Sequence, residues 1–372
     1  MNIELKEKTE RLVDMLGREG LDAVLLNAQH NFSWLTGGSS NGVDLSRENG
    51  VASLLVTRDG KRFLLANNIE VQRMLDDEVN AEDFEPVSFS WQDEKADPGL
   101  VIEMARSVLE PFGAVASDVT IDASIASIEG KIAACRHRLT ADELIRIRTL
   151  GTDAGEALRR AIDRLKPGDL ETEIAEKMRH ELAGVGLHSV VTLVAADERI
   201  SKFRHPVPTT NRWQKTLLIV TCARRRGLIV SLSRMISIGE ASDDLKRRTV
   251  AAACVNAALY AATRPGATGA ELYHAAANAY AEQGFAGEIN LHHQGGAAGY
   301  KTREWVAHPA SNEVVKPDQA FAWNPSITGT KVEETCIVND SGVEVITASP
   351  DFPKIETVID GRHYYSPGIL SL

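Results

Sequence analysis

The sequence predicts a two-domain fold of the α/β (α+β) class, and three observations support this. Residues 1–138 alternate helical and strand patterns, which indicates a small α/β domain. Residues 139–372 contain two copies of a long helix, a Pro-Gly turn and a second helix. Strand-rich sequence follows each copy, so the larger domain is expected to hold a curved, mostly antiparallel sheet backed by helices.

In the first domain, apolar residues recur at helical spacing from Leu5 to Leu16, and residues 21–27 follow as a buried strand. Residues 51–57 and 61–66 are two further apolar runs. Asp59 and Gly60 lie between them and form a good hairpin turn, so these runs are predicted to pair antiparallel.

In the second domain, Thr140 precedes Glu143 by three residues, a capping-box pattern that predicts the start of a long helix at this point. Pro167 and Gly168 end that helix, and a second one follows over residues 170–186. Residues 242–285 repeat this order. The expected strands after the two copies cover residues 189–196, 216–239, 319–327, 330–340 and 342–348.

Composition excludes several functional classes. The formal net charge of −11 repels phosphate backbones, so nucleic acid is not an expected partner. The four cysteines lack CxxC spacing, which argues against a zinc knuckle and a disulfide framework and favours a reducing, cytoplasmic location. The sequence shows neither a signal-peptide pattern nor an apolar run long enough to span a membrane.

Several segments carry a resemblance to a known family. Residues 203–239, which begin FRHPVPTT, and residues 264–285 are similar in order and pattern to segments of the creatinase and aminopeptidase P family. The segment GTKVEETCIV at residues 329–338 resembles that family's closing strands, and NFSWLTGG at residues 31–38 resembles a short motif of its N-terminal domain. The resemblance implies a creatinase-like N-terminal domain and a C-terminal pita-bread domain.

Peptidase members of that family hold two metal ions with two aspartates, a histidine and two glutamates. The resemblance places these five ligands at Thr221 or its neighbour Val220, Ser231, Gly296, Asn324 and Glu333. Only Glu333 is a carboxylate, and a dinuclear site needs several anionic oxygens and imidazoles to offset repulsion between the ions. We therefore expect no metal ligands and no cofactor.

Two histidines remain as candidate catalytic residues. His205 occupies the place of the proton-shuttling histidine of metal-free creatinase, and imidazole suits proton transfer near neutral pH. His292, four residues before Gly296, matches a histidine that contacts substrate. Neighbouring strand residues point to opposite faces, so only one of His292 and His293 is expected to enter the pocket.

The other candidates bind or orient a substrate. Glu333 is expected to face the pocket, either orienting the reacting group or paired with Arg234 or Lys331. Arg47 and Arg303 are candidate carboxylate anchors, because a guanidinium binds a carboxylate in bidentate fashion. Three polar residues complete the set of candidate substrate-binding side chains: Ser231, Gln294 and Asn324.

The leading interpretation is a metal-independent hydrolase of a carbon–nitrogen bond in a small, polar, carboxylated substrate, with His205 as general acid and base. Two alternatives stay open: a catalytically inactive pita-bread binding protein, and a metal-dependent Xaa-Pro aminopeptidase or dipeptidase with an unusual site. The resemblance also implies a homodimer. Apart from that second copy, the expected partner is a small molecule.

Overall fold

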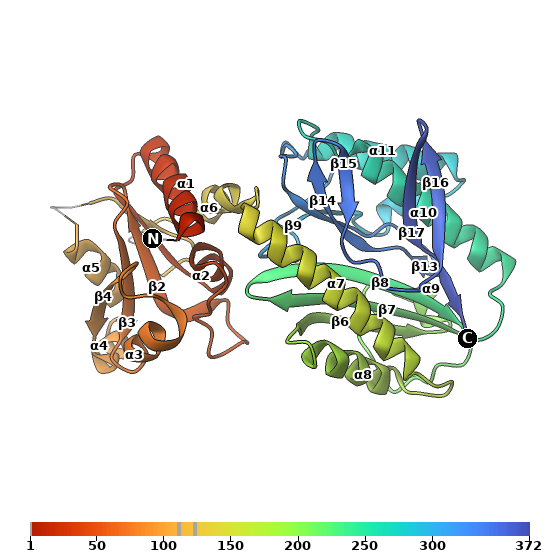
Figure 1. Cartoon of the computed structure of the whole chain (residues 1–372), viewed down its shortest axis with the longest axis horizontal. Helices are drawn as coiled ribbons and strands as arrows, with labels where there is room; N and C mark the ends of the chain where they lie inside the picture. Colours follow the sequence, from red (N-terminus) through yellow and green to blue (C-terminus); the bar gives the residue numbers. More distant parts are fainter. Residues whose placement is uncertain (1, 110–112, 122–124) are drawn as a thin grey trace. The chain divides into compact units, whose positions relative to one another are not determined.

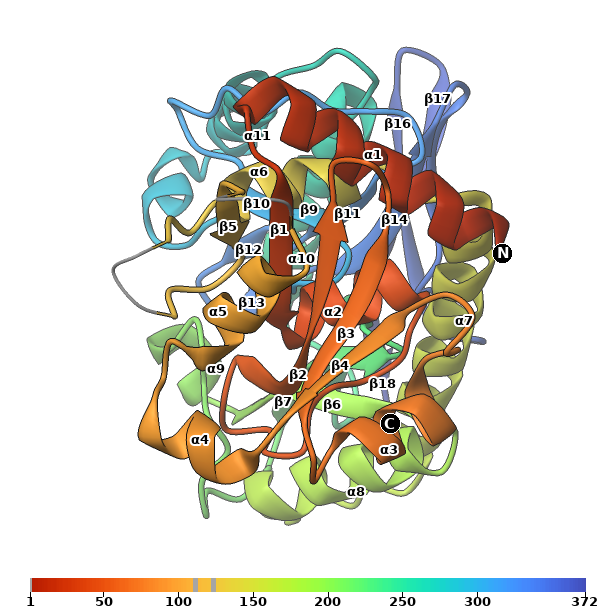
Figure 2. The ribbon, with the colours of Figure 1, turned by 90° about the vertical axis from the view of Figure 1, so that its left-hand side faces the viewer.

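The computed structural model describes residues 2–109, 113–121 and 125–372. They form two compact units, the first ending at residue 137 and the second beginning at residue 138. The first unit contains a five-stranded sheet in the order β4-β3-β2-β1-β5. Its strands are β1 Ala23–Ala28, β2 Asn49–Thr57, β3 Arg62–Asn67, β4 Glu85–Phe89 and β5 Val115–Ser117. Strands β1, β2 and β3 run side by side in Figure 2. The sheet is mixed, because β4 pairs in parallel with β3 and β5 pairs in parallel with β1.

Helices of the first unit surround this sheet. They are α1 Ile3–Glu19, α2 Gln29–Thr36, α3 Val71–Arg73 with the π-helical turn Met74–Glu78, α4 Trp91–Ala96, α5 Leu100–Ser107 and α6 Glu129–Arg136. The predicted hairpin is confirmed: β2 and β3 pair antiparallel, and Gly60 lies in the turn with a φ of +82°. Leu25, Leu55 and Leu65 form part of the core between the sheet and α5.

The second unit contains two larger sheets that meet along β8 and β14. One has the order β18-β8-β7-β6, and the other has the order β10-β9-β11-β14-β15. The first sheet comprises β6 His188–Ala196, β7 Thr216–Arg225, β8 Leu228–Ser237 and β18 Ile369–Ser371. The second comprises β9 Gly295–Ala298, β10 Trp305–Val306, β11 Ala320–Trp323, β14 Glu334–Asn339 and β15 Gly342–Val345.

Two short ladders complete this unit, β12 Ser326–Ile327 with β13 Thr330–Lys331 and β16 Lys354–Ile359 with β17 Arg362–Pro367. The helices are α7 Ala141–Asp163, α8 Glu171–Ala183, α9 Arg199–Lys202, α10 Asp243–Ala262, α11 Gly269–Glu282 and the 3₁₀ turn Ala286–Asn290. Helices α7 and α8 lie against the β6–β8 sheet (Figure 1), while α10 and α11 cover the other sheet through a core containing Tyr260, Tyr280 and Trp323.

Local sequence signals account for the helix starts. Thr140 and Glu143 form the predicted capping box at the start of α7, which satisfies two backbone N–H groups that the helix itself leaves unbonded. Along α7, Ile147, Leu150, Ala154 and Leu158 are buried at helical spacing, so one stripe of the helix packs on the sheet. No helix in the three described stretches is both long and apolar enough to cross a lipid bilayer.

Candidate functional site

The junction of β8 and β14 positions the polar side chains of the site. The backbone N–H of Ser233 donates to the carbonyl oxygen of Glu333 at 3.1 Å, and the N–H of Ser231 donates to Oγ1 of Thr335 at 2.7 Å. Side chains alternate along both strands. As a result, Ser231 and Glu333 both contact the guanidinium of Arg303 on one face. Arg234 and Glu334 pair with each other on the opposite face.

Glu333 is buried between two cations. Its Oε1 lies 3.1 Å from a terminal nitrogen of Arg303, and its Oε2 lies 3.2 Å from Nζ of Lys331. All three side chains are largely buried. Of the two pairings considered for Glu333, the structure thus has the one with Lys331, while Arg234 pairs with Glu334. One carboxylate with two cations leaves a formal charge of +1 where peptidase members of the family place two dications.

The two expected positions for the first metal ligand, Val220 and Thr221, face opposite sides of the sheet. Cys222 is directly opposite Ser231 in the β7–β8 ladder, and the Ser231 hydroxyl contacts its Sγ at 3.2 Å. Thr221 points to the other face, where its Oγ1 lies 2.9 Å from the hydroxyl of Ser189. Thr221 therefore faces away from Ser231, whereas Val220, two residues before Cys222, lies on the same face as Cys222 and Ser231. Burial raises the pKa of Cys222, so it remains a thiol at neutral pH.

Gly296 cannot be replaced by a metal-binding side chain without moving the backbone. A Cβ atom built on Gly296 would lie 2.0 Å from the carbonyl oxygen of Trp305 in the adjacent strand β10. Together with Cys222, Ser231 and the cation-paired Glu333, this arrangement does not fit a pair of divalent ions. The family's dinuclear metal site is therefore not built by these residues.

Three imidazoles gather near this cluster. The Nε2 atoms of His205 and His292 lie 3.2 Å apart, and the rings of His292 and His293 stack with centroids 4.4 Å apart. The expectation that only one of His292 and His293 would enter the pocket is wrong. Strand alternation does not apply to them, because β9 begins at Gly295 and both histidines precede it in irregular backbone.

The environment keeps the imidazoles neutral. Burial lowers the pKa of His205, and the positive charge of Lys331 lowers it further. Burial also lowers the pKa of His292 to about 2 and that of His293 to about 4, with contributions from Lys331 to both. A neutral imidazole carries a lone pair on one nitrogen and an N–H on the other, so each ring can both accept and donate a hydrogen bond.

Among the described residues, His205, His292 and His293 are a group whose ring nitrogens could hold a metal ion, since these atoms lie within 4.8 Å of one another. The surrounding charges oppose such an ion. Lys331, Arg303 and Arg204 are near enough to lower the pKa values of these rings, and the same positive potential disfavours a dication. The arrangement therefore suits proton transfer better than metal binding.

Two other predicted substrate contacts have different surroundings. The amide of Gln294 is engaged within the protein: its Nε2 donates to the carbonyl oxygen of His292, and its Oε1 accepts from the hydroxyl of Tyr280 at 2.6 Å. Gln294 thus positions His292. Asn324 is also buried, but its Oδ1 has no hydrogen-bond partner within the described parts of the chain, so it can accept a hydrogen bond from a substrate.

The two predicted arginine anchors belong to different units. Arg303 lies beside Glu333, and its buried Nε–H has no hydrogen-bond acceptor among the residues described. Arg47 belongs to the first unit, where it lines a cavity of about 320 Å³ together with Asn49 and Lys95. Sequence reasoning did not place Cys222 or Arg204 in the site, and it left open which of His292 and His293 enters it.

The two units and the junction of two curved sheets define a creatinase-like protein with a pita-bread domain, which confirms the predicted fold class. Residues 146–344 match metallopeptidase family M24, and residues 8–144 match the creatinase/prolidase N-terminal domain. The chain therefore belongs to family M24.

Relatives and solved structures agree with this assignment. An uncharacterized peptidase of Bacillus subtilis is 21% identical over 92% of this chain and 98% of its own length. A dipeptidase from Mycobacterium ulcerans superposes with a TM-score of 0.79 at 16% identity, over 99% of this chain and 98% of that chain. An Xaa-Pro dipeptidase from Bacillus anthracis gives a TM-score of 0.75 at 18% identity, over 99% of this chain and all (100%) of that chain.

Proposed function

We propose that this protein is a metal-independent hydrolase that cleaves a carbon–nitrogen bond in a small, carboxylated substrate, with His205 as the proton-transfer residue. The observation that carries the proposal is the pair of Nε2 atoms of His205 and His292, 3.2 Å apart, beside a cationic cluster rather than a set of anionic metal ligands. The similar proteins named Xaa-Pro dipeptidases support hydrolysis of a carbon–nitrogen bond as the reaction class.

The two imidazoles share one proton between their facing nitrogens. Of two neutral rings in contact through Nε2, one must donate and the other must accept. In the proposed reaction, water adds to the carbon of the scissile bond and gives a proton to His205. His205 then delivers that proton to the leaving nitrogen as the carbon–nitrogen bond breaks, so His205 returns to its neutral state.

The cationic cluster is suited to an anionic substrate. Arg303 and Lys331 exceed the charge of Glu333 by one, and the Nε–H of Arg303 is available as a donor. A substrate carboxylate would accept charge-assisted hydrogen bonds here. The same positive potential would stabilise the negative charge that develops on oxygen when water adds.

The test is turnover of small carboxylated compounds, for example N-acyl amino acids, guanidino acids and Xaa-Pro dipeptides, followed by analysis of the products. We expect His205→Asn to lower kcat/KM by roughly 100-fold or more, the usual contribution of a general acid–base residue. His180→Asn on the exposed surface of α8 is the matched control and should leave turnover unchanged.

Unchanged turnover in His205→Asn would contradict the assignment. Binding of these compounds without any product would favour a pita-bread binding protein instead.

A further inference from the structure

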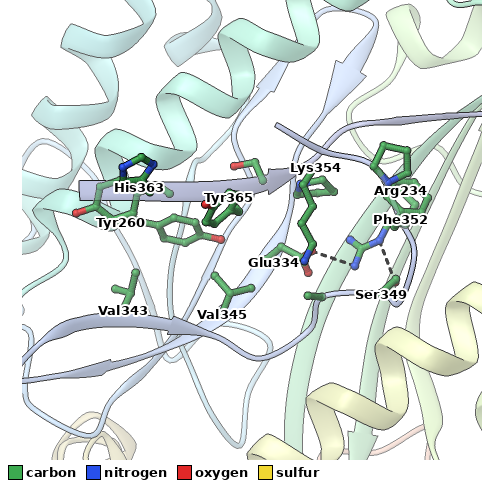
Figure 3. A pocket seen from close by; sticks show the side chains of 15 residues that line it. Arg234, Tyr260, Glu334, Val343, Val345, Ser349, Phe352, Lys354, His363 and Tyr365 are labelled. Atoms are coloured by element: carbon green, nitrogen blue, oxygen red, sulfur yellow. Dashed lines mark hydrogen bonds and ion pairs between the residues drawn. The ribbon is translucent and has the colours of Figure 1, made fainter. Parts of the chain in front are cut away.

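A second cavity lies on the opposite face of the β8–β14 junction. Its volume is about 280 Å³, and its lining comes from β8, α10, β15 and the β16–β17 hairpin, all within the second unit. Figure 3 shows Arg234, Phe352 and Ser349 on one side of Glu334, and Tyr260, Val343 and Val345 on the other. Glu333, just before β14, contacts Arg303 and Lys331, whereas Glu334, the first residue of β14, contacts Arg234, so the cavity and the candidate active site are on different faces.

The polar floor of this cavity is fixed and nearly charge-neutral. Arg234 lies 2.9 Å from Oε1 of Glu334, and both side chains are almost fully buried. Arg234 also donates to the hydroxyl of Ser349 and to the carbonyl oxygens of Ser233 and Thr347. Thr347 donates its hydroxyl to Oε2 of Glu334 at 2.5 Å. These bonds hold the two charged groups rigidly and leave no net charge on the floor.

The walls are aromatic and aliphatic. The ring of Phe352 lies over the guanidinium of Arg234 with 5.2 Å between the guanidinium carbon and the ring centroid. Tyr260 and Tyr364 approach each other with ring centroids 6.3 Å apart, and Val343 and Val345 line the cavity from β15. Such a surface accommodates a flat or branched apolar group, as most small-molecule pockets do.

Lys354 adds a positive charge to a cavity whose floor, the Arg234–Glu334 pair, carries no net charge. It is exposed at the start of β16 and lines the cavity, and the described residues provide no carboxylate within ion-pair distance of its ammonium group. His363, also in the lining, is instead engaged by Glu356 at 2.6 Å. One cation above a neutral floor and apolar walls selects for a ligand with an apolar body and a single negative charge.

We propose that this cavity is a binding site for a small amphipathic carboxylate, with an aromatic or branched apolar body between Tyr260, Phe352 and Val345 and its carboxylate on Lys354. The site does not depend on the proposed hydrolase activity, since it shares no side chain with the cluster of histidines, Arg303 and Glu333. Its occupation can therefore be measured by binding alone.

The probe is 3-phenylpropionate, and its amide, 3-phenylpropionamide, is the uncharged ligand of the same shape. Isothermal titration of the full-length protein should show one site for the acid and binding at least about tenfold weaker for the amide, because a charge-assisted hydrogen bond is lost. Lys354→Met keeps the apolar stem and should weaken binding of the acid by about tenfold, removing its advantage over the amide.

Two further variants make the test decisive. Val345→Phe fills the cavity and should abolish binding of both ligands, whereas Lys6→Met, on the exposed face of α1 in the other unit, should change neither. Equal binding of acid and amide by the unmodified protein, or binding of the acid by Val345→Phe with unchanged affinity, would overturn the proposal.

Discussion

At Gly296, the backbone of the neighbouring strand leaves no space for a metal-binding side chain. Its neighbour β10 approaches so closely that a Cβ atom would meet the carbonyl oxygen of Trp305 at 2.0 Å. A contact this short involves backbone on both sides, so it cannot be relieved by rotation of a side chain. A histidine at this position would therefore require β9 or β10 to shift.

This packing predicts that the ligand cannot be restored by a single substitution. Gly296→His should lower the stability of the second unit by about 3 kcal/mol or more, because an overpacked site must displace the backbone. Scanning calorimetry would measure the shift. Gly287→His is the matched control, since no atom lies within 4 Å of a Cβ built there. Equal melting temperatures for the two variants would contradict this view of β10.

The neutral imidazoles predict a pH dependence of stability. Burial lowers the pKa values of His292 and His293 to about 2 and about 4, whereas the unfolded chain titrates near 6.5. Below about pH 6.5 the unfolded state thus binds protons that the folded state does not, so the free energy of unfolding falls as the pH is lowered. The double variant His292→Asn/His293→Asn should lose less stability between pH 7.5 and pH 5 than the unmodified protein does.

A thermal melt at each pH compares the two proteins. The same decline in melting temperature for both would show that these rings do not carry the effect.

Individual site residues were only partly predictable from the sequence. His205 and His292 could be selected because they stand in recognisable motifs, and the structure brings their rings together. Cys222 could not, because one residue of register in the β7–β8 hairpin decides whether it or Thr221 faces the site. Strand alternation predicted that His292 and His293 would not both enter the site, but alternation holds only where a strand is actually formed.

At the scale of elements, β8 and β14 are joined by the buried ion pair of Arg234 and Glu334, both almost fully inaccessible to solvent. Removing one partner of a buried pair leaves the other charge without compensation. Glu334→Gln is therefore expected to destabilise the second unit by about 3 kcal/mol.

The control for Glu334→Gln is the same substitution at Glu344, which belongs to an ion pair on the surface. It pairs with Arg148 at 2.8 Å, but both side chains are substantially exposed, so Glu344→Gln should cost less than about 1 kcal/mol. Denaturant titration of both variants measures the difference. If Glu334→Gln were as stable as Glu344→Gln, β8 and β14 would not depend on this pair.

Elements were the most predictable part of the molecule. The capping box of Thr140 and Glu143 and the turn at Asp59 and Gly60 are local signals, and both elements form where these signals place them. The pairing of β8 with β14 was not predictable in the same way, because it joins residues about one hundred positions apart, such as Ser233 and Glu333. No short-range pattern specifies such a contact.

At the scale of the whole molecule, the second unit has the pita-bread fold of family M24, and our proposal is that its reaction needs no metal ion. Glu333 binds Arg303 and Lys331, so protein cations occupy the electrostatic role that metal ions have in the peptidases. In the proposed function, proton transfer by His205 is the chemistry of this site.

The pH dependence of turnover follows from this arrangement. The lowered pKa of His205 means that its neutral form, the one that accepts a proton from water, is already dominant at neutral pH. We expect kcat/KM to be constant from about pH 7 upward and to fall only on the acidic side. Lys331→Met removes a nearby positive charge, so it should move the acidic limb toward higher pH.

The most direct test of the central claim is turnover by protein freed of metal. The protein would be dialysed against a chelator, its metal content measured by mass spectrometry, and hydrolysis of a carboxylated substrate followed before and after. The account predicts undiminished turnover without bound metal and no increase on adding Mn²⁺ or Zn²⁺. Loss of turnover on metal removal, with recovery when Mn²⁺ or Zn²⁺ is returned, would contradict it.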